Sequence, residues 1–202
     1  RIGQHLLAAG KLEESLPFLH QGARDARETG GFDMALNLLD AQEKALRSIP
    51  IASSDSRWGH LWHQRLVNNY NLRRLEGVEP MAEKLAQAAR DNHWIRLLPI
   101  ATRWQGLIAS AKNDLEGALQ YFAQSESLLQ EDQEYQHAFI LRNWSVLLRQ
   151  LGRAEESRTK LDRAAAISET LNYRSELART RYQQAALQNI LFQDQDEALR
   201  LL

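Results

Sequence analysis

Helix-ending residues recur along this chain at intervals that are mostly close to twenty residues. They are Gly10, Gly30 with Gly31, the loop "IPIASSDSR" at 49–57, Gly77, Asp91 with Asn92, Asn113 with Asp114, Asp132, Gly152, Asn172 and Asp194. Between these breaks the apolar residues keep helical spacing, as at Leu119, Phe122 and Leu129. The chain also lacks the short alternating runs of Val, Ile and Thr that indicate strands. The sequence therefore predicts an all-α fold.

The breaks divide the chain into helices of similar length. We expect helices at 1–9, 13–28, 33–47, 57–75, 80–91, 95–111, 115–130, 134–150, 154–171, 174–192 and from 196 onward. Short turns make neighbouring helices run antiparallel, and each hairpin leaves an apolar face that the next hairpin must cover. We therefore expect one solenoid domain over 1–202 with about five hairpins. These are 13–47, 57–91, 95–130, 134–171 and 174–202, with 1–9 as the end of an upstream repeat.

Small residues mark the places where two helices would cross closely. The pattern is a small residue, a second small residue twelve positions later, and a large apolar residue four positions after that. It occurs as Gly106, Ala118 and Phe122; as Ser145, Ser157 and Leu161; as Ala186, Ala198 and Leu202; and as Ala23, Ala35 and Leu39. The hairpin at 57–91 departs from it, because bulky Tyr70 stands at the first small position, although Ala82 follows where expected.

This spacing resembles the tetratricopeptide repeat (TPR), whose first helix carries a small residue and whose second helix carries an Ala followed by a Phe. The resemblance implies a superhelix of antiparallel helix hairpins. Successive triplets lie 47, 36, 39 and 41 residues apart. Repeats of this length are similar to the helical regions that follow the ATPase module in large bacterial signalling proteins, including multidomain serine/threonine kinases.

The first repeat has two possible registers. Gly3, Ser15 and Leu19 also fit the triplet, which would make 13–28 the second helix of a hairpin. We expect one helix to take only one of the two roles, and we assign 13–28 as a first helix.

Charge and composition argue against several classes of function. The 25 Lys and Arg residues nearly balance the 26 Asp and Glu residues, so the chain lacks the basic excess that nucleic acid or an anionic membrane attracts. There is no cysteine, which suits a reducing cytoplasm, where we expect the protein to work. No apolar run approaches the roughly 18 residues of a membrane span, and the first residues do not form a signal peptide. Because the chain starts at Arg1 and stops inside the helical pattern "EALRLL", we expect it to be a segment of a longer protein.

Motifs for catalysis or metal binding are weak or missing. His60 and His63 in "HLWH" share a helix face, which could hold a metal with a third ligand, but no carboxylate stands nearby in the sequence. Trp58 and Trp62 stand beside these histidines, which favours aromatic packing. No nucleophile motif, glycine-rich phosphate loop or HExxH sequence occurs. We expect no enzyme activity, no metal and no cofactor.

The resemblance to TPR proteins implies that the first helix of each hairpin lines a concave groove. The side chains that face it are Arg103, Trp104 and Leu107 in one hairpin; Phe139, Arg142, Asn143, Val146 and Arg149 in the next; and Gln64, Val67, Asn68, Asn71 and Arg74 in the hairpin at 57–91. Of these, the candidate partner-binding residues are Arg103, Trp104, Phe139, Arg142, Asn143, Arg149, Asn68, Asn71 and Arg74. Arg and Asn beside aromatic rings suit an acidic or amidic peptide or a partner helix.

Three hypotheses for the function follow. The first is a non-catalytic protein–protein interaction scaffold that docks a peptide or partner helix in the groove, within a larger bacterial signalling or regulatory protein. The second is a structural or regulatory arm that packs against an attached ATPase or kinase domain. The third is self-association into homo-oligomers through the terminal helices. Docking predicts exposed apolar side chains in the groove, whereas an arm predicts them at the ends or on the convex flank.

Overall fold

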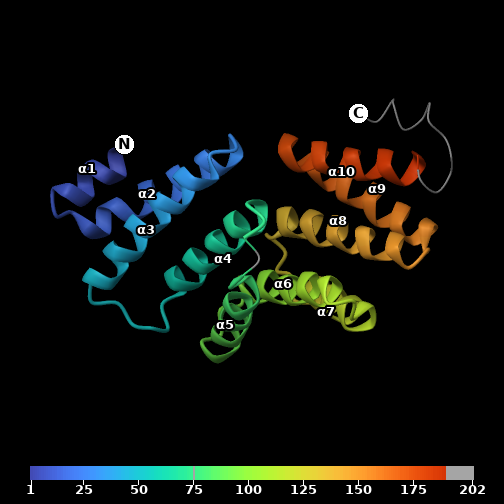
Figure 1. The fold of residues 1–202 in the computed structure, drawn as a ribbon, viewed down its shortest axis with the longest axis horizontal. Helices are drawn as coiled ribbons and strands as arrows, with labels where there is room; N and C mark the ends of the chain where they lie inside the picture. The colour runs from blue at the N-terminus through green and yellow to red at the C-terminus, as the bar shows by residue number, and fades with distance from the viewer. Residues whose placement is uncertain (75, 190–202) are drawn as a thin grey trace. The chain divides into compact units, whose positions relative to one another are not determined.

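The fold is helical throughout the part of the chain that the computed structural model describes, residues 1–74 and 76–189 (Figure 1). The helices are α1 (Ile2–Ala8), α2 (Leu12–Glu28), α3 (Phe32–Ser48), α4 (Ser56–Asn71), α5 (Val78–Asp91), α6 (Leu98–Ala111), α7 (Leu115–Ser127), α8 (Glu134–Gln150), α9 (Ala154–Thr170) and α10 (Arg174–Leu187). The prediction of an all-α fold built from helix hairpins is confirmed. The helix expected from 196 onward lies outside the described residues.

The helices form two compact units. Unit 1 contains α1 to α5 and ends at Leu97, and unit 2 begins at Leu98 and contains α6 to α10. That residues 1–202 act as one domain stays a prediction.

Several predicted breaks are places where the backbone turns into the left-handed region. The φ angle is 71° at Gly152, 64° at Asn113 and 49° at Asn172. Gly has no Cβ to clash there, and Asn is enriched in this region relative to other residues. Each of the three lies two residues beyond the end of its helix, so these residue types stop α8, α6 and α9 where the sequence predicted.

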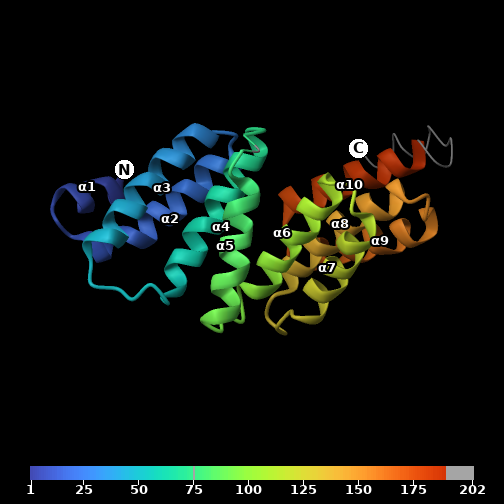
Figure 2. The same ribbon diagram turned by 60° about the horizontal axis from the view of Figure 1, so that its bottom comes forward.

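In unit 2 the first helices of the hairpins lie in one layer. α6 packs against α7 and α8 packs against α9, while α8 also contacts α6 on one side and α10 on the other. Figures 1 and 2 show α8 beside α9 and α10 in both views. Side chains from α6, α8 and α10 can therefore meet on the same surface of this unit.

In unit 2 the small residues of two triplets lie at the helix contacts, as predicted. Ala118 is fully buried, and a Cβ added at Gly106 would lie 3.3 Å from the Phe122 ring. In the next hairpin the Ser157 hydroxyl donates a hydrogen bond to the Ser145 carbonyl oxygen at 2.9 Å. A hydroxyl is thus tolerated at this buried position because the partner helix supplies its acceptor. Ala198 and Leu202 of another triplet lie outside the described residues.

In the α4–α5 hairpin the close helix contact is at Gly59 and not at Tyr70. Tyr70 is 40% exposed and does not fill a crossing, whereas Ala82 is fully buried. Gly59, near the start of α4, is the residue that leaves no room for a side chain. A Cβ there would lie 2.5 Å from the Leu97 side chain and 2.6 Å from the Trp94 ring.

Both registers of the first repeat are present in the structure. Ser15 and Leu19 are buried on α2, and a Cβ added at Gly3 of α1 would lie 3.0 Å from Leu19. Ala23 of the same helix is also buried, and α2 packs against α1 and α3. The expectation that one helix takes only one role was wrong, because its opposite faces serve two neighbours. That residues 1–9 end an upstream repeat stays a prediction.

His20 belongs to α2 and contacts α4 in unit 1. The ring of His20 is 6.4 Å from that of His60, edge to face, and its Nε2 atom is 3.5 Å from Gln64 Nε2. Gln64 also accepts a hydrogen bond from Arg27. Burial, and then the positive charge of His60 and of two nearby arginines, lower the pKa of His20 from 6.5.

Replacing Ala118 by Trp should destabilise the protein. The new ring would be forced into a full helix contact, at a cost of about 1–3 kcal/mol in the free energy of unfolding through overpacking. Gln120→Trp on the exposed side of the same helix is the control. Denaturant unfolding measures both, and an equal effect of the two substitutions would show that α7 does not cross its neighbour at Ala118.

Acidification should destabilise unit 1 through His20. The pKa of His20 is lower in the folded state than its ordinary 6.5, so the unfolded state takes up more protons as the pH falls through this range. Stability present above pH 6.5 is therefore lost below it. Thermal unfolding of wild type and His20→Gln from about pH 7.5 to about pH 5.5 tests this. The melting temperature should fall less in the variant, and equal falls would contradict the assignment.

Candidate functional site

A group of basic and aromatic side chains lies in the α6, α8 and α10 layer of unit 2. Arg103 comes from α6, Phe139 and Arg142 come from α8, and Glu176 comes from α10. The guanidinium carbon of Arg103 is 5.3 Å from the centre of the Phe139 ring, and that of Arg142 is 5.9 Å from the same centre. These distances are typical of cation–π contacts. We call these four residues the arginine cluster.

Arg142 is held by a buried carboxylate. Its Nε atom donates a hydrogen bond to Glu176 Oε1 at 2.5 Å, and the side chain of Glu176 is fully buried. The pair joins α8 to α10. Because an isolated buried carboxylate is costly, removing Arg142 would leave Glu176 with a large desolvation penalty.

Arg103 is buried without such a carboxylate. The residue is only 5% exposed, and its Nε atom has no hydrogen-bond partner in the described part of the chain. Burial, and then the charge of Arg142, lower its pKa to about 10, although Glu176 opposes this. At neutral pH the group is therefore still a cation. It rests on aromatic faces, with the Trp104 ring centre 6.0 Å away.

The other predicted residues of unit 2 differ in how deeply they are buried. Trp104 is buried and belongs to the interior of the protein. Asn143 and Arg149 of α8 are partly exposed. The structure thus brings Arg103, Phe139 and Arg142 together and leaves Asn143 and Arg149 accessible on the same helix as two of them.

The three predicted residues of unit 1 use their polar groups within that unit. Asn68 is fully buried, and its amide donates to the Gln64 carbonyl at 2.8 Å. Asn71 is exposed and donates to the carbonyl of Val67 at 2.8 Å. Arg74 forms an exposed ion pair with Asp33 at 2.9 Å.

Sequence reasoning did not find Glu176, which is the acidic partner in the cluster. It stands in the first turn of α10, where a carboxylate is expected for its interaction with the helix dipole. The one sequence signal is that Glu176 and Thr180 stand four residues apart, so they share one face of α10. The structure buries both of them completely. The sequence alone could not show that this face of α10 packs against α8 and buries Glu176.

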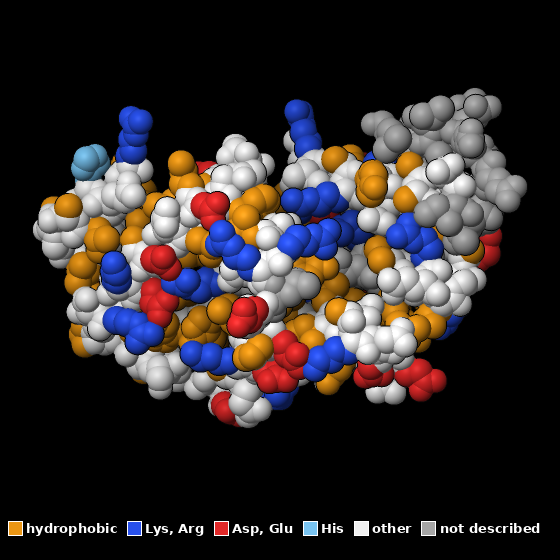
Figure 3. All heavy atoms as spheres, in the orientation of Figure 1, with side chains coloured by type: hydrophobic (Ala, Val, Ile, Leu, Met, Phe, Trp, Pro, Cys, Tyr) orange, Lys and Arg blue, Asp and Glu red, His pale blue; other side chains and the backbone are white. Residues whose placement is uncertain are grey.

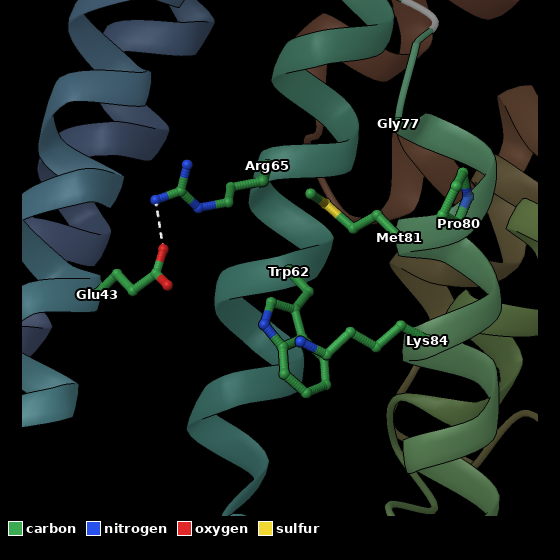
Figure 4. A pocket seen from close by; sticks show the side chains of 7 residues that line it. All are labelled: Glu43, Trp62, Arg65, Gly77, Pro80, Met81 and Lys84. Atoms are coloured by element: carbon green, nitrogen blue, oxygen red, sulfur yellow. Dashed lines mark hydrogen bonds and ion pairs between the residues drawn. The ribbon is translucent and has the colours of Figure 1, made fainter.

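A shallow pocket of about 380 Å³ lies in unit 1 between α4 and α5, next to α3 (Figure 4). Figure 4 shows Trp62, Met81 and Lys84 pointing toward one another, and Arg65 turned to Glu43 at 2.7 Å. The Lys84 ammonium lies 4.2 Å from the centre of the Trp62 ring. Trp62 was predicted to form an aromatic packing surface, and here it forms one wall of the pocket.

Among residues 1–74 and 76–189, no group of three or more His, Cys, Asp or Glu side chains could hold a metal ion. Within these same ranges, none of the helices has the length and apolar character needed to cross a bilayer.

Comparisons with known proteins bear on the fold. No family model and no curated protein matches the chain. Among solved structures it is similar to a crystal structure from Podospora anserina, described as a kinesin light chain with nearly identical TPR-like repeats. The TM-score is 0.59 at 15% sequence identity, and the match covers 92% of this chain and 90% of that chain. At this identity the likeness shows the fold alone. The chain therefore has a TPR-like helical-repeat fold.

Proposed function

We propose that this chain is a non-catalytic protein–protein interaction scaffold that docks a peptide or partner helix on the α6, α8 and α10 layer of unit 2. TPR-like repeats typically serve as interaction scaffolds, which supports the general role. The arginine cluster is the observation that supports this particular surface. Two guanidinium groups lie against the Phe139 ring, and only one of them has Glu176 as a hydrogen-bond partner.

The chemistry of this surface favours a partner that is acidic on one face and apolar beside it. Figure 3 shows Lys and Arg side chains gathered over α8 and α10. Tyr135, one turn before Phe139 on α8, is 45% exposed, and Phe139 packs edge to face on Tyr173. Guanidinium groups bind carboxylates in a planar, bidentate geometry, while aromatic rings bury apolar side chains of the same ligand.

We also propose that the chain belongs to a larger bacterial signalling or regulatory protein and works in the cytoplasm. The length of the repeats supports a larger bacterial signalling or regulatory protein, and the lack of cysteine supports a cytoplasmic location.

A second candidate function is a structural arm that packs against an attached ATPase or kinase domain. The observation in its favour is a set of exposed apolar side chains on α1, α2 and α3 of unit 1, namely Ile2, Phe18 and Met34. A domain that packs against unit 1 would cover such exposed apolar side chains.

Selection of peptides from a random dodecapeptide library tests the docking proposal. Enriched sequences should combine Asp or Glu with aromatic or aliphatic residues, and their affinity should fall as salt rises from about 0.05 M to about 0.3 M. Phe139→Ala should weaken their binding by about 1–2 kcal/mol, since a central aromatic ring is a typical binding hot spot. Arg149→Gln should weaken it less, because this cation is partly exposed and therefore solvated.

Arg158→Gln is the control, since this exposed arginine of α9 lies outside the arginine cluster. Arg142→Ala is a poor variant here, because it would strip Glu176 of its partner and confuse binding with stability. Enrichment of sequences without acidic residues, or unchanged binding to Phe139→Ala, would refute the proposal.

A further inference from the structure

Two residues of the arginine cluster have buried polar atoms that lack a hydrogen bond within the part of the chain that the structure describes. In the described residues, the buried side-chain atoms that lack a hydrogen bond include Arg103 Nε, Glu176 Oε2 and Thr180 Oγ1. These three residues belong to α6 and α10, which both contact α8. Buried polar groups are usually paired, so the unpaired donor Arg103 Nε marks a place where an acceptor atom of a ligand could bind.

The charges of the cluster are also out of balance. Arg103 and Arg142 are two cations against one aromatic ring, and Glu176 is the single buried carboxylate beside them. Arg179 adds a further positive charge 4.0 Å from Glu176 Oε2, although its side chain is largely exposed. A buried cation without a counter-ion is costly, so this excess of positive charge favours an incoming anion.

We propose that the arginine cluster is a subsite for one carboxylate group of the partner, bound by Arg103 and Arg142 over the edge of Phe139. This inference rests on the docking function proposed above and names the anchor of that ligand. Glu176 binds Arg142 through Nε alone, so it does not occupy the terminal nitrogens of that guanidinium. One bound carboxylate would give two cations and two anions in the cluster.

A carboxylate suits this charge better than a phosphate does. Arg103, Arg142 and Glu176 together carry one excess positive charge, which a carboxylate neutralises and a phosphate dianion exceeds. Glu176 would also repel the second charge of a phosphate in this poorly solvated place. The carboxylate can come from an Asp or Glu side chain or from the end of a chain, because both have the same chemistry.

Arginine side-chain NMR on the whole chain tests the subsite directly. Three pools of hexapeptides with uncharged residues at the varied positions serve as probes: an acetylated and amidated pool with a central Glu, the same pool with a central Gln, and the Gln pool with a free C-terminal carboxylate. The Nε–Hε signal of Arg103 should shift with the first or the third pool and not with the second. The pool that causes the shift identifies a side-chain or a terminal carboxylate as the source, and inorganic phosphate at the same ionic strength should cause no comparable shift.

Two variants separate binding from structure. Arg103→Met should weaken the binding of the pool that causes the shift by at least about tenfold, because it removes a charge-assisted hydrogen bond to the ligand. Glu176→Gln should instead strengthen binding, because it removes the buried negative charge that opposes the ligand. A merely structural role of Glu176 would not produce stronger binding. Arg158→Gln again serves as the control.

The outcomes are distinct from those of the docking proposal. No shift of the Arg103 signal in wild type with any pool would refute the subsite, whatever the stability of the variants. Library peptides that depend on Phe139 but bind Arg103→Met and Glu176→Gln as tightly as wild type would leave docking intact and refute the carboxylate subsite. A shift with phosphate alone would show that the cluster selects a different anion.

Discussion

Close contact between helices at small side chains is the constraint on which the rest of this structure depends. Ala118 and Gly106 bring α6 and α7 together over Phe122, and Ser157 and Ser145 bring α8 and α9 together through a hydrogen bond. Such contacts leave α6, α8 and α10 free to lie side by side, with α8 in the middle. This layer places side chains from helices far apart in the sequence around the Phe139 ring, so the candidate site is a consequence of the helix packing.

Much of the fold could be predicted from the sequence because its signals are local. Helices end near Gly152, Asn113 and Asn172 because glycine and asparagine tolerate a left-handed backbone conformation. The contact made by Gly59 could not be predicted, because it depends on Trp94 and Leu97, which reach it from beyond the end of α5. The double role of α2 was missed for a related reason. A triplet describes one face of a helix, and the sequence does not say that the opposite face is also used.

The candidate site was predictable only in part. Helical spacing places Phe139 and Arg142 on one face of α8, and the repeat places Arg103 beside them, as the structure describes. Burial was not predictable, because the same spacing also marked Asn68, which the structure buries completely. Glu176 was missed since its burial depends on the approach of α10 to α8. The sequence therefore indicates which cations are close, while the balance of charge among them emerges only from the packing.

The central claim is that Arg103 is a buried cation without a counter-ion of its own when no partner is bound. The most direct measurement is the free energy of unfolding of Arg103→Met compared with wild type, without ligand at neutral pH. Methionine replaces the aliphatic part of the side chain and removes the guanidinium with its charge, so relief from the unpaired charge should offset the lost ring contacts. We predict a stability within about 1 kcal/mol of wild type, or higher. A loss of about 3 kcal/mol or more would show that Arg103 is paired inside the folded protein, which would contradict this account.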